Sequence, residues 1–236
     1  MKLKIIFVLI VLYSCNSNEG TTITWKNYCL NGKVKLISDR FVLKPQNIEE
    51  MADTFQNKIT TIQNRHFDEN GNLFKVEYFN KDSLLLLEVK HLFSRNGKII
   101  GSEIYKNGEK TEKVKIKKTG ELVETKSYNV ETNKLNSTTN TEYLNGFSYR
   151  QVTEYYESER KMSQEIIYLR NEKGLETEIQ NNIKINEEVI SYIVSINYLE
   201  LDNLGNWIRR DECTLDGNND CKLVIRQIFY YIKIFV

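Results

Sequence analysis

Proline, histidine and long apolar runs are all scarce in this chain of 236 residues. The only proline is Pro45, and the only histidines are His66 and His91. A single proline leaves the pairing of β-strands almost uninterrupted. The histidines have no paired metal-ligand spacing around them, which disfavours a zinc site.

The motifs of the common enzyme classes are missing as well. The chain has no Gly-x-Ser-x-Gly elbow, no phosphate-binding Gly-Lys-Ser/Thr loop and no dinucleotide fingerprint. We therefore expect a protein that is not an enzyme and uses no cofactor.

An excess of one charge sign is also absent. Lys and Arg number 33 against 32 Asp and Glu, without a basic block, which excludes nucleic acid as a partner.

What the chain does contain begins with an N-terminal signal. Lys2 and Lys4 precede an apolar run over residues 5–12. This run is too short for a transmembrane helix, because crossing a bilayer takes roughly 20 residues. Residues 1–14 are therefore expected to be a secretory signal peptide.

The end of this signal, Leu12-Tyr-Ser-Cys15, resembles the lipobox of bacterial lipoproteins. The resemblance implies that Cys15 becomes the first mature residue and carries lipid, which would make the membrane a partner. An ordinary cleaved signal with an incidental Cys15 is the alternative. Asn16 replaces the aspartate that retains enterobacterial lipoproteins in the inner membrane, so the resemblance favours the outer membrane of the cell envelope. Residues 15–22 are polar and read as a lipid-anchored flexible tether.

The remaining residues, 23–236, are expected to form a single all-β repeat domain. Apolar and charged residues alternate in segments such as Val114-Lys-Ile-Lys117 and Ile183-Lys-Ile185, as in strands with one buried face. One short helix is expected near residues 46–56, because Pro45 suits a first helical turn.

Turn motifs with a glycine recur along this domain. The fullest copies are Asp68-Glu-Asn-Gly-Asn72 and Asp202-Asn-Leu-Gly-Asn206, with further turn glycines at positions 97, 120, 146 and 174. Each copy predicts a hairpin, because these residues tolerate the backbone of a tight turn. We therefore expect an extended or rolled antiparallel sheet of repeated β-hairpins.

The Asp-x-x-Gly-Asn pattern resembles YD or RHS-type repeats, and the Asn-Gly copies resemble those of MORN-like proteins and of many Bacteroidetes lipoproteins. The resemblance loosely covers residues 67–231. It implies strand-turn-strand units in a continuous antiparallel sheet. It also suggests an alternative role as an immunity or accessory protein of a secreted toxin system.

An apolar residue follows each turn glycine by one or two positions, which predicts a buried row on one sheet face. The row is Leu73, Ile99, Leu122, Phe147, Leu175 and Trp207. Trp207 is therefore expected to be a core residue rather than an exposed platform for sugars.

Two cysteines near the C-terminus, Cys213 and Cys221, flank a turn-rich segment. In an oxidising envelope compartment they are expected to form a disulfide. Asp216, Asn218 and Asp220 between them offer oxygen ligands and are a weak calcium candidate. A solvated hairpin tip is favoured over a calcium site, so no metal is expected.

Taken together, these patterns predict a non-enzymatic, lipid-anchored envelope protein that acts as a binding or scaffolding surface. Its partner, a protein or a glycan, is not identified by the sequence. Repeats of this kind specify architecture more strongly than chemistry.

Overall fold

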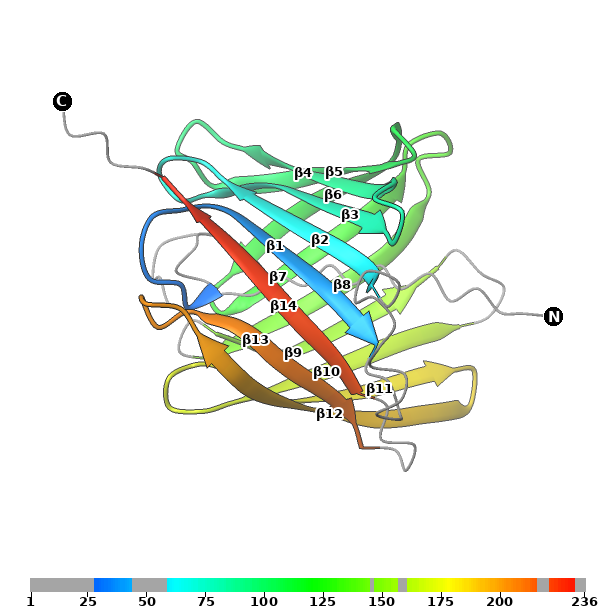
Figure 1. The fold of residues 1–236 in the computed structure, drawn as a ribbon. Helices are drawn as coiled ribbons and strands as arrows, with labels where there is room; N and C mark the ends of the chain where they lie inside the picture. The colour runs from blue at the N-terminus through cyan, green and yellow to red at the C-terminus, as the bar shows by residue number, and fades with distance from the viewer. Residues whose placement is uncertain (1–27, 44–58, 145–146, 157–160, 216–220, 232–236) are drawn as a thin grey trace.

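The computed structural model describes residues 28–43, 59–144, 147–156, 161–215 and 221–231. These residues fold into a closed barrel of antiparallel strands, in which each strand pairs with its neighbours in the chain and β1 pairs with β14 (Figure 1). The strands are β1 (Val34–Leu43), β2 (Ile59–Phe67), β3 (Leu73–Asn80), β4 (Leu85–Phe93), β5 (Ile99–Lys106), β6 (Glu109–Thr119), β7 (Leu122–Asn129), β8 (Leu135–Leu144), β9 (Phe147–Tyr155), β10 (Met162–Arg170), β11 (Glu176–Ile185), β12 (Glu188–Leu201), β13 (Trp207–Thr214) and β14 (Cys221–Tyr230).

The all-β, antiparallel character is as expected, but the expectation of an extended or rolled sheet with one helix is wrong. The ladder between β1 and β14 runs from Val34–Tyr230 to Leu43–Lys222 and closes the sheet into a barrel. Twisted open sheets of more than about 10 strands curl, and closure pairs the backbone groups that two free edges would expose. The described residues contain no helix, and the segment 46–56 lies outside them.

The repeated glycine motifs do form hairpin turns. In the copy at Asp202, the Gly205 N–H donates to the Asp202 carbonyl and the Asp202 N–H donates to the Asn206 carbonyl. The Asp202 carboxylate also accepts the Asn206 N–H at 2.8 Å, and Gly205 supplies the positive φ of 79° that the turn needs. The turns at Asp68, Ser94 and Asn171 repeat the same pair of backbone bonds.

All of these turns lie at one end of the barrel, called the repeat end here. They join β2 to β3, β4 to β5, β10 to β11 and β12 to β13. Because neighbouring strands run in opposite directions, every second connection falls at the same end. The repeat therefore places its turns at the same end of the barrel.

Residues opposite one another on neighbouring strands share a face of the wall. Asp39 lies opposite Arg226 on β14 and opposite Gln63 on β2, and Gln63 lies opposite Tyr78 on β3. Asp39, Gln63 and Arg226 are almost fully buried, which identifies this face as the interior.

Apolar side chains form one cluster within the interior. A buried cluster that includes Val34, Ile37, Phe67 and Ile104 fills the side formed by β1 to β6. On β7 to β10 several buried inward positions hold uncharged polar side chains. They are Thr125, Ser127, Thr141, Thr153 and Gln164.

The segment just before β1 enters the barrel at the repeat end. Tyr28 and Leu30 belong to the apolar cluster, and the Tyr28 ring meets Phe67 edge-on with centroids 5.6 Å apart. The Asn31 N–H donates to Asn206 Oδ1 at 2.6 Å, and Asn206 Nδ2 donates to the Asn31 carbonyl at 3.1 Å. The last repeat turn therefore holds this segment in place.

Candidate functional site

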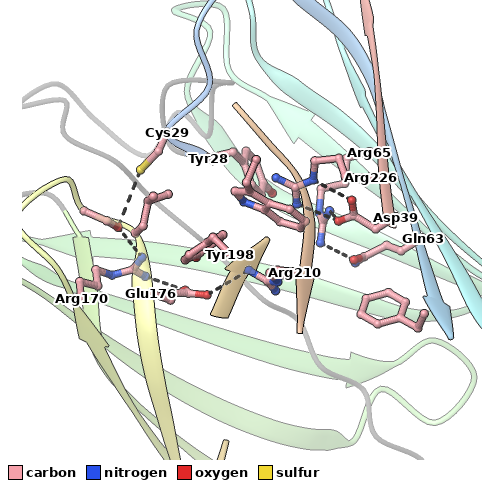
Figure 2. Close-up of a pocket in the computed structure, with 14 residues that line it drawn as sticks. Tyr28, Cys29, Asp39, Gln63, Arg65, Arg170, Glu176, Tyr198, Arg210 and Arg226 are labelled. Carbon is pink, nitrogen blue, oxygen red and sulfur yellow. Dashed lines mark hydrogen bonds and ion pairs between the residues drawn. The ribbon is translucent and has the colours of Figure 1, made fainter. Parts of the chain in front are cut away.

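A cluster of charged side chains lies inside the barrel, around Asp39 on β1. Arg226 on β14 binds the Asp39 carboxylate with two bonds, from Nε at 2.7 Å and from Nη2 at 2.8 Å. Arg65 on β2 donates from Nη1 to the same carboxylate at 2.5 Å and also contacts the Gln63 side chain. Two guanidinium groups thus share one carboxylate (Figure 2).

These groups are removed from water. Their surroundings favour the charged form of Asp39 and disfavour the charged form of Arg226. Burial raises the pKa of Asp39, but Arg226 and Arg65 outweigh it and hold that pKa well below its usual range. Burial lowers the pKa of Arg226, against the opposing effect of Asp39 and with the help of the like charges on Arg65 and Arg210. Asp39 is therefore ionised at neutral pH, in strongly positive surroundings.

A second charged cluster lies on the neighbouring part of the interior, around Glu176 on β11. Arg170 on β10 donates to Glu176 at 2.9 Å, while Arg210 on β13 lies 3.9 Å from Glu176 and also pairs with Glu212. Burial raises the pKa of Glu176 despite the opposing effects of Arg170 and Arg210.

Trp207 connects the two clusters. The Arg226 guanidinium lies 3.4 Å from the centre of the Trp207 ring and that of Arg210 lies 4.4 Å from it. Both distances are within the range of a cation–π interaction. Trp207 is 5% exposed, which confirms the expectation of a core residue.

Only some of the other residues in the predicted apolar row are buried as Trp207 is. Leu73 and Ile99 are buried, and Phe147 and Leu175 are half-buried. Leu122 is 41% exposed, so the prediction of burial is wrong there. Leu122 lies opposite Glu142, which pairs with Arg150 on the outer face of the wall, so Leu122 also faces outwards.

A cavity of about 100 Å³ lies between the two clusters. Its lining brings together four arginines, two carboxylates and several aromatic rings. They include Arg65, Arg170, Arg210, Arg226, Asp39, Glu176, Trp207, Tyr28, Tyr198 and Phe41. Guanidinium groups present fixed forks of N–H donors, which match carboxylate and phosphate oxygens. The arrangement can therefore bind an anion, and the described residues that line it include no histidine and no serine.

The outer face of the wall is charged as well. Lys75, Lys90, Glu103 and Lys113 lie opposite one another in sequence across β3, β4, β5 and β6. On the far side, Arg150 pairs with Glu165 at 2.8 Å on this outer face. These side chains lie where a membrane-inserted barrel would face lipid.

One of the sites predicted from the sequence is confirmed, and the others lie outside the described residues. Cys213 and Cys221 form the expected disulfide, which joins opposed residues of β13 and β14. Cys15 with the tether, and the calcium candidates Asp216, Asn218 and Asp220, lie outside the described residues. Among the described residues, no group of His, Cys, Asp and Glu side chains is arranged to hold a metal ion. That part of the chain also has no helix long and apolar enough to cross a membrane.

The charged interior was missed by sequence reasoning. Arg65 and Arg226 alternate with uncharged residues such as Asn64 on β2 and Ile225 on β14, so alternation alone places these two charged side chains on the solvent side of their strands. The available signal was Asp39 at an inward position two residues after Ile37. It is informative only once strand pairing is known.

Neither a protein-family model nor a curated protein sequence matches this chain. Among solved structures, a porin-like protein from Bacteroides vulgatus is similar at 12% identity and a TM-score of 0.49, over 85% of this chain and 99% of that one. A porin-like protein from Bacteroides uniformis is similar at 9% identity and a TM-score of 0.37, over 83% and 96%. The Tc holotoxin pore of Photorhabdus luminescens matches at 13% identity and a TM-score of 0.33, over 79% of this chain but 11% of that one. At these values the likenesses assign no function to this chain.

Proposed function

We propose that this protein is a non-enzymatic binding protein of the bacterial cell envelope, held at the outer membrane by lipid on Cys15, with its barrel in water and its ligand inside. The observation that carries this proposal is the charged cavity beside Trp207, enclosed by a wall that is also charged on its outer face. The toxin-immunity alternative has no feature of the cavity in its favour.

The outer face supports a barrel that stands in water. Barrels that cross membranes present an apolar band about 25 Å tall to the lipid. Here Lys75, Lys90, Glu103 and Lys113 occupy successive outward positions on four neighbouring strands. Lys90 also pairs with Glu88 at 2.9 Å on the same face. Such a row is favourable in water and unfavourable in hydrocarbon.

The disulfide supports an envelope location. Cys213 and Cys221 are bonded across β13 and β14. Structural disulfides persist in oxidising compartments such as the periplasm and the cell surface. The lipobox resemblance at residues 12–15 agrees with export and supplies an anchor that does not depend on the barrel wall.

The inner cavity supports binding rather than catalysis or scaffolding alone. Burying several charges destabilises a fold unless they are paired or used. In this interior Arg65 and Arg226 each donate to the Asp39 carboxylate at 2.5–2.8 Å, and the three residues come from three different strands. A rigid, preorganised donor set of this kind is typical of ligand sites.

The test separates the lipid anchor from the barrel wall. Wild type should incorporate labelled palmitate, and Cys15→Ala should not. A second chain, in which an ordinary cleavable signal peptide replaces residues 1–15, should be recovered in the soluble periplasmic fraction. If that chain instead remains in membranes after alkaline carbonate extraction, the barrel inserts by itself and the proposal is wrong.

A further inference from the structure

The cavity between the two charged clusters has more positive than negative groups around it. Among the described residues, Arg65, Arg170, Arg210 and Arg226 line it together with Asp39 and Glu176. Counting Glu212, which pairs with Arg210, four arginines face three carboxylates, which leaves one positive charge in excess.

An excess charge in a buried position is unfavourable unless an opposite charge joins it. The excess is concentrated at Asp39, where Arg65 and Arg226 share a single carboxylate. Arg210 approaches the same place from β13, because it and Arg226 both pack against Trp207. A bound anion would relieve this repulsion and accept N–H bonds from several strands at once.

The size of the cavity restricts what can enter it. A volume of about 100 Å³ holds several water molecules or one small polar group. This is room for a carboxylate or phosphate group and not for a whole cofactor, since drug-sized ligands need about 300–1,000 Å³.

A cleft in the wall adjoins this cavity. The ladder between β11 and β12 stops at the pair Glu178–Ser195, although β12 continues to Leu201. Beyond that pair lies a cleft of about 570 Å³ between the β10–β11 turn, residues 171–175, and the end of β12. Leu175 and Tyr198 line both the cleft and the cavity, so the two adjoin.

We propose that the cavity binds the oxyanion group, carboxylate or phosphate, of a ligand whose body rests in the cleft between β11 and β12. The proposal rests on the proposed function, since it names the chemistry of the ligand that the interior takes. Arg210 and Arg226 supply the donors, and Trp207 fixes the planes of both guanidinium groups. Leu175, Leu199 and Leu201 offer the body of the ligand an apolar surface.

Two adjacent arginines on β13 provide a matched comparison. Arg210 faces the cavity, whereas Arg209 lies on the outer face, 3.9 Å from Glu200 and about half exposed. The full-length chain, purified in detergent, is titrated by calorimetry with inorganic phosphate and, separately, with acetate at constant ionic strength. Tryptophan fluorescence gives a second readout in a Trp25→Phe background, where it reports Trp207 alone, because this ring contacts Arg210.

We expect saturable binding of phosphate, acetate or both by wild type. Arg210→Gln should weaken it by about tenfold or more, and Arg209→Gln by less than about twofold, because only Arg210 can form a charge-assisted bond to the anion. Tighter binding of phosphate would identify a phosphate-bearing ligand, and tighter binding of acetate a carboxylic acid. Arg210→Lys, which keeps the charge, should fall between wild type and Arg210→Gln.

Absence of saturable binding of either probe overturns the inference, as does equal weakening by Arg209→Gln and Arg210→Gln. Thermal melting shows whether Arg210→Gln folds. If it does not, Arg210→Lys against Arg209→Lys decides the comparison. These results are independent of the fractionation test. If the barrel is soluble without its lipid but binds neither probe, only the proposal of oxyanion binding is overturned. If the barrel inserts into membranes by itself, only the proposed function is overturned.

Discussion

The two faces of the barrel wall carry the same kind of ion pair in different surroundings. Inside, the side chains of Arg65 and Asp39 are 7% and 2% exposed, whereas outside those of Arg150 and Glu165 are 43% and 30% exposed. The bond lengths are similar, at 2.5 and 2.8 Å. Burial therefore decides what each pair contributes, because water screens the outer pair and the inner pair has no substitute for its partner.

The comparison teaches that charge alone does not locate a site in a barrel. The outer pairs are open to solvent, and the inner cluster holds guanidinium groups in fixed positions beside a cavity. Four variants test whether this contrast between the two faces holds.

The largest expected effect is that of Asp39→Asn. This change keeps the shape of the side chain but removes the charge that Arg65 and Arg226 share. Removing one member of a buried ionic cluster typically costs about 3–5 kcal/mol, because the remaining charges stay buried. Urea unfolding should show a loss of that size in the free energy of unfolding. A loss too small to resolve would mean that the inner cluster is as well hydrated as the outer pairs.

Trp207→Ala should have the next largest effect, again in contrast to a residue on the outer face. Trp207 is 5% exposed and packs against two arginines, and truncating a buried Trp typically costs about 3–5 kcal/mol. The melting temperature should fall by about 2–4 °C for each kcal/mol in a chain of this size. Tyr128, which packs against Lys115 on the outer face, is the control. Tyr128→Ala should lower the melting temperature much less, and equal losses would remove the distinction.

A pH-dependent effect is expected from His91, which is buried on the inner face and bonded to Ser102 at 2.8 Å. Burial lowers the pKa of His91 from 6.5 to about 4. The unfolded chain therefore takes up a proton near pH 6.5 that the folded chain accepts only near pH 4. Stability from the neutral ring is complete above pH 6.5 and declines as the pH falls towards 4, by about 3 kcal/mol.

Unfolding titrations between pH 7 and pH 4 check this, with wild type compared to His91→Gln. The variant should lose most of the decline in this range. The matched control is His66→Gln, because His66 lies on the outer face beside Glu77. A decline that survives in His91→Gln would assign it to other groups.

Local features of this fold could be predicted from the sequence, because they depend on neighbouring residues. The Asp-x-x-Gly-Asn turn at Asp202 closes its backbone hydrogen bonds within five residues, so the turn itself forms from local sequence. The Cys213–Cys221 disulfide lies across one such hairpin and was predicted for the same reason. Closure of the barrel depends instead on β1 and β14, at opposite ends of the domain, and no local pattern specifies their pairing.

Whether a side chain faces into or out of the barrel could not be predicted from its distance in sequence from the turn glycine, because that distance changes from one copy of the repeat to the next. Tyr78 follows Gly71 by an odd number of positions and faces inwards, where Gln63 donates to it at 2.7 Å. Tyr105 follows Gly97 by an even number and faces outwards, against Lys90. Strand side chains alternate, so one residue decides the face, and bulges such as that between Ile104 and Tyr105 shift the count. The inner arginines were missed for this reason.

The smallest expected effect is that of Glu165→Gln, the outer counterpart of Asp39→Asn. Glu165 on β10 accepts from Arg150 at 2.8 Å and from Asn182 at 3.2 Å, and both bonds are open to water. Arg150 keeps a second partner, Glu142, at 3.0 Å, so it is not left without a carboxylate. Exposed pairs contribute little because water and salt replace the lost partner, and the melting temperature should shift by at most about 2 °C. A large loss in Glu165→Gln that persists in high salt would show that the outer ladder is as well shielded as the inner cluster, since only shielded charges escape screening.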